Sequence, residues 1–223
     1  MPINIAIDGP VGAGKSSIAD GVASRLHLLH LDTGAMYRAV GLYMLKSGVD
    51  LQNPSEVQKH MDSADVQVEY RDGAQRTLLC GEDVTADLRT DAVSAAASAV
   101  SKVPYVRRKM VAMQQEIARH ADILLDGRDI GTVVLPDAPV KVFLTATPEE
   151  RARRRMLQQQ AAGIQADFET VLAQLNARDY QDMHRETDPL RQAEDAWLLD
   201  STNMTENEVI EAIVGRVEEV YGR

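Results

Sequence analysis

The sequence predicts an α/β fold in which a parallel sheet is flanked by helices and interrupted by one inserted antiparallel lobe. Three observations support this prediction: short apolar runs alternate with amphipathic stretches, a glycine-rich loop follows the first run, and one segment alternates polar and apolar residues with period two. The chain has 223 residues, 44% hydrophobic and 26% charged. That composition is typical of globular proteins, and the length suffices to bury a core without disulfides.

Five apolar runs are predicted to be buried strands because they lack polar alternation, as do parallel strands covered on both faces. Between them, apolar stripes of helical period predict helices, and Thr147 and Thr205 are placed to cap the starts of two more. Strands that alternate with helices indicate right-handed βαβ units. The predicted strands are 3–7, 28–31, 123–126, 140–144 and 197–200, and the predicted helices include 15–26, 104–120, one from Thr147 to Gly163, and one after Thr205.

One segment does not fit a parallel sheet. Val66–Tyr70 alternates with period two, residues 71–74 contain Asp-Gly, and a second run follows at residues 77–80. This pattern is typical of a β-hairpin. Residues from about 60 to 90 are therefore predicted to form the inserted antiparallel lobe.

Composition excludes several classes of protein. The formal net charge is −10 and only 4% of residues are aromatic, which disfavours a nucleic-acid-coating surface. No apolar run approaches 18 residues and no polybasic patch occurs, which disfavours a membrane partner. Cys80 is the single cysteine, which excludes a disulfide framework and indicates a reducing compartment. With no secretory signal at the N-terminus, a cytoplasmic monomer is expected.

A phosphate-binding loop follows the first predicted strand. Residues 9–16 match GxxxxGK[ST] and precede a predicted helix, which is the context that this motif requires. Backbone N–H groups and the helix N-terminus would hold phosphates, Lys15 would reach the β- and γ-phosphates, and the Ser16 hydroxyl would ligate Mg²⁺, with Ser17 as an alternative. The predicted ATP-binding residues are Gly9, Pro10, Val11, Gly12, Ala13, Gly14, Lys15, Ser16 and Ser17.

Arginines recur beside acids after the strands. Residues 32–38 and 126–129 each follow a predicted strand, at the edge where open α/β sheets bind ligands, although either alone could be a turn with a surface ion pair. The helix after Thr147 carries Arg151 on one face with Arg154 or Arg155, a spacing that would let them converge on one phosphate group. A further set at spacings of 4 and 3 also shares a helical face: Arg178, Asp182 and Arg185. A solvated charged face is the alternative for both helical sets.

Together these blocks resemble the bacterial cytidylate kinases, within the nucleoside-monophosphate kinases, almost end to end. The resemblance implies a P-loop NTPase fold with a five-stranded parallel sheet and an arginine-rich lid, in a single domain over 1–223. It implies a core of 1–35, 101–146 and 190–223, a monophosphate-binding lobe with the insert at about 36–100, and a lid at about 147–189. The blocks are 8–16, 32–38, 81–84, 126–134, 136–138, 150–156, 178–185 and 199–202.

The resemblance also implies roles for single residues. Carried over position by position, the acceptor phosphate would be held by Thr33, Arg38, Arg128 and Arg185. The cytosine edge would be recognised by Ser98, Arg107 and Asp129, and the ribose by Asp182 with support from Arg178. Arg154 and Arg155 would bridge the transferring phosphoryl group, so that the catalytic set is Lys15, Arg128, Arg154, Arg155 and Arg185. Two positions depart from the family pattern: Thr33 where serine is commoner, and Asp188 where a small residue is usual.

The activity implied is transfer of the γ-phosphoryl group of ATP to CMP, and to dCMP, with Mg²⁺ bound as Mg-ATP. Elementary chemistry agrees, because the second pKa of a phosphate monoester is near 6 and the acceptor needs no general base. A carboxylate at Asp129 would accept from the cytosine amino group but repel the O4 of uracil. A kinase for another monophosphate such as UMP, or a non-catalytic P-loop nucleotide sensor, remains an alternative.

Overall fold

The computed structural model describes residues 2–161 and 163–222. The chain divides into two compact units, and each is described by itself: unit 1 comprises residues 1–2 and 29–122, and unit 2 comprises residues 3–28 and 123–223. Residues 1, 162 and 223, which belong to the predicted core and lid ranges, lie outside the described residues. The predicted division into core, lobe and lid stays a prediction.

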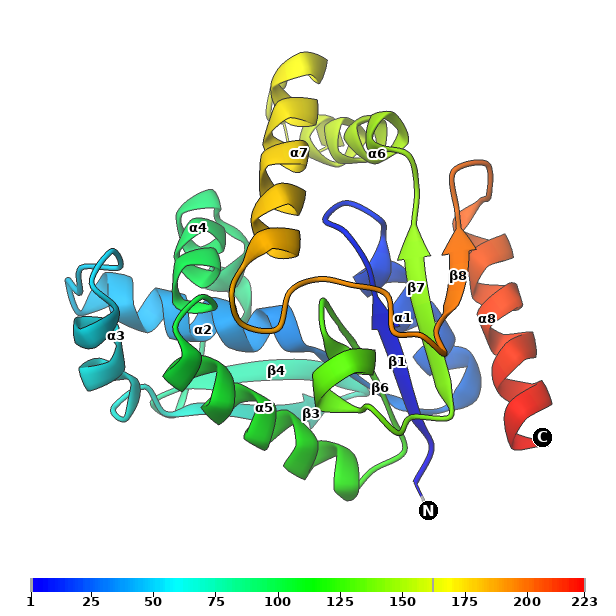
Figure 1. The fold of residues 1–223 in the computed structure, drawn as a ribbon, viewed down its shortest axis with the longest axis horizontal. Helices are drawn as coiled ribbons and strands as arrows, with labels where there is room; N and C mark the ends of the chain where they lie inside the picture. The colour runs from blue at the N-terminus through cyan, green and yellow to red at the C-terminus, as the bar shows by residue number, and fades with distance from the viewer. Residues whose placement is uncertain (1, 162, 223) are drawn as a thin grey trace. The chain divides into compact units, whose positions relative to one another are not determined.

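The sheet confirms the predicted α/β class. Its five strands lie in the order β2-β6-β1-β7-β8. Within unit 2 the strands are parallel, with Ile5 of β1 opposite both Leu124 and Val140, and β7 and β8 run in the same direction (Figure 1). All five predicted strands occur, at β1 (Asn4–Asp8), β2 (Leu29–Asp32), β6 (Ile123–Gly127), β7 (Val140–Thr145) and β8 (Trp197–Asp200).

The core of unit 2 joins two helices to the sheet. Ile18 and Val22 of one helix pack with Ile213 and Val217 of another and with the side chains of β1 and β7. The last helix begins after Thr205, as predicted, and its start is a capping box in which Thr205 and Glu208 bond reciprocally. The helices of this unit are α1 (Lys15–Leu26), α6 (Pro148–Ala161), α7 (Phe168–His184) and α8 (Glu206–Tyr221), with a π-helical turn at Ile130–Val134.

The other predicted cap is only half formed. The Thr147 hydroxyl accepts from the Glu150 N–H at 3.3 Å, as a cap should. The Thr147 N–H, however, donates to the Thr202 hydroxyl at 3.0 Å, and the Glu150 carboxylate accepts from Arg153 and Arg154. The reciprocal arm of the capping box is therefore replaced by a bond to the segment after β8.

The bend from β1 into the glycine-rich loop depends on Gly9. Its φ is +153°, and a Cβ at this position would lie 2.0 Å from the Leu144 carbonyl oxygen of β7. Any side chain there would collide with backbone, so glycine is the residue that lets the loop leave the sheet edge.

Unit 1 holds the predicted inserted hairpin. β3 (Val66–Arg71) pairs antiparallel with β4 (Ala74–Leu79), and β4 pairs with the short β5 (Glu82–Asp83). The turn residues Asp72 and Gly73 both have positive φ, 53° and 76°, the geometry that an Asp-Gly hairpin favours. The antiparallel prediction is confirmed.

Helices make up the rest of unit 1. Two of them approach closely at Gly41, where a Cβ would lie 2.8 Å from the backbone nitrogen of Ala97. The helix that contains Gly41 begins directly at Thr33, where the sequence pattern predicts only the end of a strand. These helices are α2 (Thr33–Lys46), α3 (Pro54–Met61), α4 (Asp91–Val100) and α5 (Pro104–Arg119), with a 3₁₀ turn at Thr85–Arg89. Among the described residues, no helix combines the length and apolarity that crossing a bilayer requires.

Candidate active site

The glycine-rich loop of unit 2 has the predicted strand–loop–helix context. It runs from the end of β1 to Lys15, the first residue of α1, and three of its glycines have positive φ: Gly9, Gly12 and Gly14. The Lys15 ammonium bends back and donates to the Pro10 carbonyl at 2.8 Å. Its cation therefore lies over the inside of the loop, where the phosphates of a nucleotide would bind.

Lys15 is almost entirely buried. Burial, and after it the nearby cation Arg128, lower the pKa of Lys15 to about 7, against the opposing effect of Asp126 and Asp8. Desolvation favours the neutral amine, so an anion arriving at the loop would restore the full charge on Lys15.

A serine and an acid lie together beside the loop. The Ser16 hydroxyl donates to Oδ2 of Asp126 at 3.0 Å, and Asp126 is buried at the end of β6. A P-loop hydroxyl and a strand-end aspartate are the protein groups that hold Mg²⁺ in P-loop NTPases. This contact favours Ser16 over Ser17 as the metal-facing serine.

Asp8 connects β1 to the segment after β6. Its carboxylate accepts from the backbone N–H groups of Ile130 and Gly131, at 2.8 and 2.7 Å. Burial raises the pKa of Asp8 to about 6, although those two hydrogen bonds act in the opposite direction. Asp8 thus holds the first turn after Asp129 in place.

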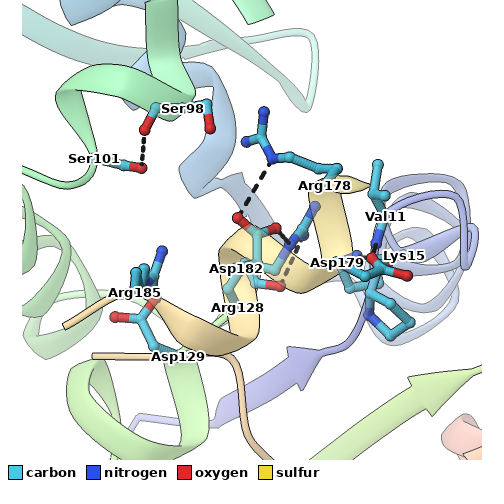
Figure 2. Close-up of polar contacts among 12 residues, drawn as sticks. Val11, Lys15, Ser98, Ser101, Arg128, Asp129, Arg178, Asp179, Asp182 and Arg185 are labelled. Atoms are coloured by element: carbon cyan, nitrogen blue, oxygen red, sulfur yellow. Dashed lines mark hydrogen bonds and ion pairs between the residues drawn. The ribbon is translucent and has the colours of Figure 1, made fainter. Parts of the chain in front are cut away.

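Two arginines that were predicted to bind CMP meet at the carboxylate of a third predicted CMP-binding residue, Asp182 (Figure 2). Asp182, on α7, accepts from Nε of Arg128 at 2.9 Å and from Nε of Arg178 at 3.3 Å. Burial alone would raise the pKa of Asp182, but Arg128 and Arg178 outweigh it and hold that pKa below its usual value. The carboxylate is ionised at neutral pH and orients both arginines.

Arg185 and Asp129 form a second pair, 3.4 Å apart and with both side chains nearly buried. Arg185 was predicted to share a helical face with Arg178 and Asp182, but α7 ends at His184 and Arg185 has an extended backbone. Its Nε donates to the carbonyl of Asp188 at 2.6 Å. Asp188 has a φ of 49°, a conformation that aspartate tolerates better than most residues, and the resulting turn orients Arg185.

The arginines of α6 separate. Arg154 donates to the hydroxyl and the carbonyl of Ser201 at 3.1 and 2.6 Å, whereas Arg155 is exposed. Arg151 is buried, donates to the Val11 and Ala146 carbonyls, and pairs with Asp179 at 2.6 Å. Although Arg151 and Arg154 were predicted to share a helical face, their partners within the protein differ.

In unit 1, two of the predicted phosphate-binding residues lie at the start of α2. The Asp32 carboxylate caps α2 through the Ala35 N–H at 2.9 Å and pairs with Arg38 at 2.5 Å. Thr33 is the first residue of the helix and is buried. Nε of Arg38 is buried with no hydrogen-bond partner among the described residues. A helix N-terminus with a cation one turn along suits an anion.

Ser98 and Arg107, predicted to recognise the base, are both buried in unit 1. The Ser98 carbonyl accepts from the Ser101 hydroxyl at 2.9 Å (Figure 2), and the Ser101 carbonyl accepts from Arg107 at 3.5 Å. The Arg107 guanidinium lies 5.6 Å from the centre of the Tyr37 ring. Arg107 is thus held by a carbonyl and an aromatic face.

Several residues that organise these groups were not predicted as site residues from the sequence. For Asp126 and Asp8 the sequence pattern could have indicated a role, because each is an acid at the carboxyl end of a buried strand. For Asp179 and Ser201 the sequence offers only their place in a motif, since their roles depend on which long side chain reaches them. Together the missed residues are Asp8, Asp126, Asp179 and Ser201, with Arg151 assigned a different partner.

Comparison with known proteins identifies the family of the chain. The family model described as "Cytidylate kinase" matches residues 5–219. Proteins named cytidylate kinase from Caldicellulosiruptor saccharolyticus and Streptococcus pneumoniae are 48% and 43% identical, covering 99% and 97% of this chain and 97% of each relative. A third, from Mycobacterium avium, is 49% identical over 93% of this chain and 91% of its own.

A solved structure shares the fold at low sequence identity. It is an uncharacterized protein from Eubacterium ventriosum, with a TM-score of 0.54 and 13% identity, covering 97% of this chain and 98% of its own. This likeness concerns the fold alone. The match of the family model over nearly the whole chain, together with relatives at 43–49% identity, shows that the chain belongs to the cytidylate kinase family.

Proposed function

We propose that this chain transfers the γ-phosphoryl group of ATP to CMP, and also to dCMP, giving ADP and CDP or dCDP by direct in-line transfer. The observation that carries the proposal lies within unit 2. A P-loop lysine and its Ser16–Asp126 pair share that unit with a second group of cations, Arg128, Arg178 and Arg185. A protein that only sensed ATP would need no second anion-binding group.

The residues of the loop fit Mg²⁺ delivered as Mg-ATP. Among the described residues no group of three or more His, Cys, Asp or Glu could hold a metal alone. Ser16 and Asp126 would supply the protein's oxygen atoms and the nucleotide's phosphates the others. When bound, the metal neutralises charge on the β- and γ-phosphates. Lys15 adds a second cation from inside the loop.

The acceptor would be bound by arginines that carboxylates already orient. Arg128 and Arg185 hold its phosphate, joined by Thr33 and Arg38 of unit 1, and Asp182 with Arg178 contacts the ribose. The buried Nε of Arg38, which has no hydrogen-bond partner among the described residues, supports a role in anion binding. Asp129, Ser98 and Arg107 recognise the cytosine edge.

The reaction needs positioning more than acid–base chemistry. The attacking oxygen of CMP is ionised at neutral pH, so no residue has to remove a proton. The two nucleotides are both polyanions, and the protein must neutralise their repulsion and align them. We assign Arg154 and Arg155 to the transferring phosphoryl group; in this structure Arg154 bonds to Ser201, so that assignment requires Arg154 to exchange partners.

One experiment separates this function from its alternatives. ADP formation from ATP should be measured with CMP, dCMP, UMP, AMP and GMP in turn. Turnover that depends on CMP or dCMP and is fastest with them is expected. Fastest turnover with UMP, AMP or GMP would indicate a different monophosphate kinase, and no acceptor-dependent turnover would indicate a sensor. We further propose that the protein acts as a cytoplasmic monomer. Gel filtration with light scattering tests the oligomeric state.

A further inference from the structure

One residue of the P-loop is held at both of its backbone groups. The Val11 N–H donates to Oδ1 of Asp179 at 3.1 Å, and the Val11 carbonyl accepts from the Arg151 guanidinium at 2.9 Å. Arg151 comes from α6 and Asp179 from α7, and Figure 2 shows Val11 with Asp179 beside it. Two helices distant in sequence from the loop thus fix the orientation of two consecutive peptides, those on either side of Val11.

The two side chains that hold Val11 also hold each other. Nη1 of Arg151 lies 2.6 Å from Oδ2 of Asp179, and the two side chains are 5% and 10% exposed. Nε of Arg151 donates to the Ala146 carbonyl at 3.0 Å, just after β7. A buried ion pair is costly unless further hydrogen bonds complete it. Here the further bonds go to the P-loop and to the end of the neighbouring strand.

Apolar packing connects the same three segments. Val11 packs against a small cluster that contains Ala152 of α6 and Leu175 of α7. Gly12 follows with a φ of +77°, and a Cβ there would lie 3.4 Å from Cβ of Arg151 and 3.6 Å from Leu175. The loop therefore lies directly on the two helices, and a shift of either helix would move Val11.

We propose that Arg151 and Asp179 are positioning residues that hold the P-loop in its nucleotide-binding conformation and make that conformation depend on how α6 and α7 pack. The inference rests on the proposed function only in taking ATP as the ligand of the loop. The proposal gives α6 two roles. Arg151 holds the P-loop through the Val11 carbonyl, and Arg154 and Arg155 are left to contact the transferring phosphoryl group. Neither Arg151 nor Asp179 needs to touch the nucleotide.

A purely structural role makes a different prediction. If the pair only joined α6 to α7, its loss would lower the melting temperature and leave substrate affinities unchanged in the folded fraction. If it positions the loop, its loss weakens binding of the nucleotide that the loop holds and spares the acceptor. The ratio of the two KM values separates these cases.

The test compares Arg151→Met, Asp179→Ala and the double variant with the parent chain, at a temperature where each is folded by circular dichroism. We expect KM for ATP to rise about 10-fold in each single variant while KM for CMP changes less than 2-fold. The double variant should resemble the single ones, because both act on one contact group. Asp179→Asn keeps an oxygen that can accept from the Val11 N–H, so it should recover part of the loss.

Arg153→Met is the matched control, since Arg153 lies on the same helix and its ion pair with Glu150 is exposed. It should leave both KM values unchanged. Equal increases in KM for ATP and CMP, or a lower melting temperature with unchanged KM values, would overturn the proposal. Direct calorimetric titration with ADP gives the same comparison without turnover. Weaker ADP binding in Arg151→Met and Asp179→Ala supports the positioning role even if CMP proves not to be the acceptor, and unchanged ADP binding in these two variants refutes it.

Discussion

Two aspartates of α7, one helical turn apart, have different kinds of partner. Asp179 bonds to the backbone of Val11 and to one arginine, so its partners are parts of the protein's own scaffold. Asp182 bonds to two arginines, Arg128 and Arg178, at their Nε atoms. A carboxylate that accepts from Nε fixes the orientation of each guanidinium.

The difference shows how one helix can serve two ends of a phosphoryl transfer. On the donor side, the carboxylate fixes a loop whose own N–H groups bind phosphate. On the acceptor side, the carboxylate orients two arginines that we propose bind CMP, Arg128 at its phosphate and Arg178 beside its ribose. Loss of the first should therefore affect ATP, and loss of the second should affect CMP.

The largest expected effect is on the donor side, at Lys15. Lys15→Met removes the cation that lies inside the loop, and we expect kcat to fall by about 10³-fold or more, the scale of a charge that stabilises the transferring phosphoryl group. Steady-state ADP formation measures it. Lys46→Met, at the exposed end of α2, is the control and should retain full activity. A fall in kcat of less than about 10-fold would remove Lys15 from the catalytic set.

The next largest effect is on the pH dependence of stability, through Asp8, which joins β1 to the turn after Asp129. Its pKa is raised in the folded chain from 3.8 to about 6, so the folded state binds the proton more tightly than the unfolded state. The stabilisation is complete below pH 3.8 and is lost as the pH rises through 6, by about 3 kcal/mol for a shift of about two pKa units. Urea unfolding between pH 4.5 and 7.5 should show this decline for the parent chain relative to Asp8→Asn. Parallel pH profiles for the two proteins would contradict it.

On the acceptor side, Asp182→Ala should raise KM for CMP about 30-fold and leave KM for ATP within about 2-fold. The reason is that Arg128 and Arg178 lose the carboxylate that orients them, a charge-assisted contact worth about 2 kcal/mol. Together with Asp179→Ala, this variant forms a direct comparison: one aspartate should affect each substrate. If both variants changed the same KM, the division of α7 into donor and acceptor sides would be wrong.

The smallest effect is on the choice of base. Asp129→Ala should narrow the preference for CMP over UMP in kcat/KM by about 10-fold, since a well-made contact to a base edge is worth about 1–3 kcal/mol. Competition between the two acceptors in one reaction gives the ratio directly. An unchanged ratio would mean that Asp129 orients Arg185 and does not contact the base.

Local signals predicted the strands, the P-loop and the hairpin well, because these depend on neighbours in sequence. The run at 3–7, the glycines of the loop and Asp72-Gly73 each define a backbone shape with few alternatives. The helix that starts at Thr33 was not predicted, because its first residue directly follows the end of a strand. The π-helical turn after Asp129 depends on Asp8, more than a hundred residues earlier in the chain.

Candidate site residues were harder to predict than elements. Spacing placed Arg151 and Arg154 on one helical face, but a long side chain can reach several partners, and burial decides among them. Arg151 pairs with Asp179 of α7, and Arg154 donates to Ser201. Arg185 lay one residue beyond the helix end, where periodicity no longer applies. The roles of the predicted acceptor residues remain predictions that the experiments above test.

The position of β1 in the sheet has a consequence for synthesis. Both of its bonded neighbours in unit 2, β6 and β7, are translated only after all of unit 1. Until then the ribosome has released an apolar strand whose edges are unpaired, followed by a glycine-rich loop that is not yet anchored to a sheet. Such long-range pairing slows folding and leaves the strand open to aggregation. In the nascent chain, β1 therefore stays unpaired longer than any other strand of the sheet.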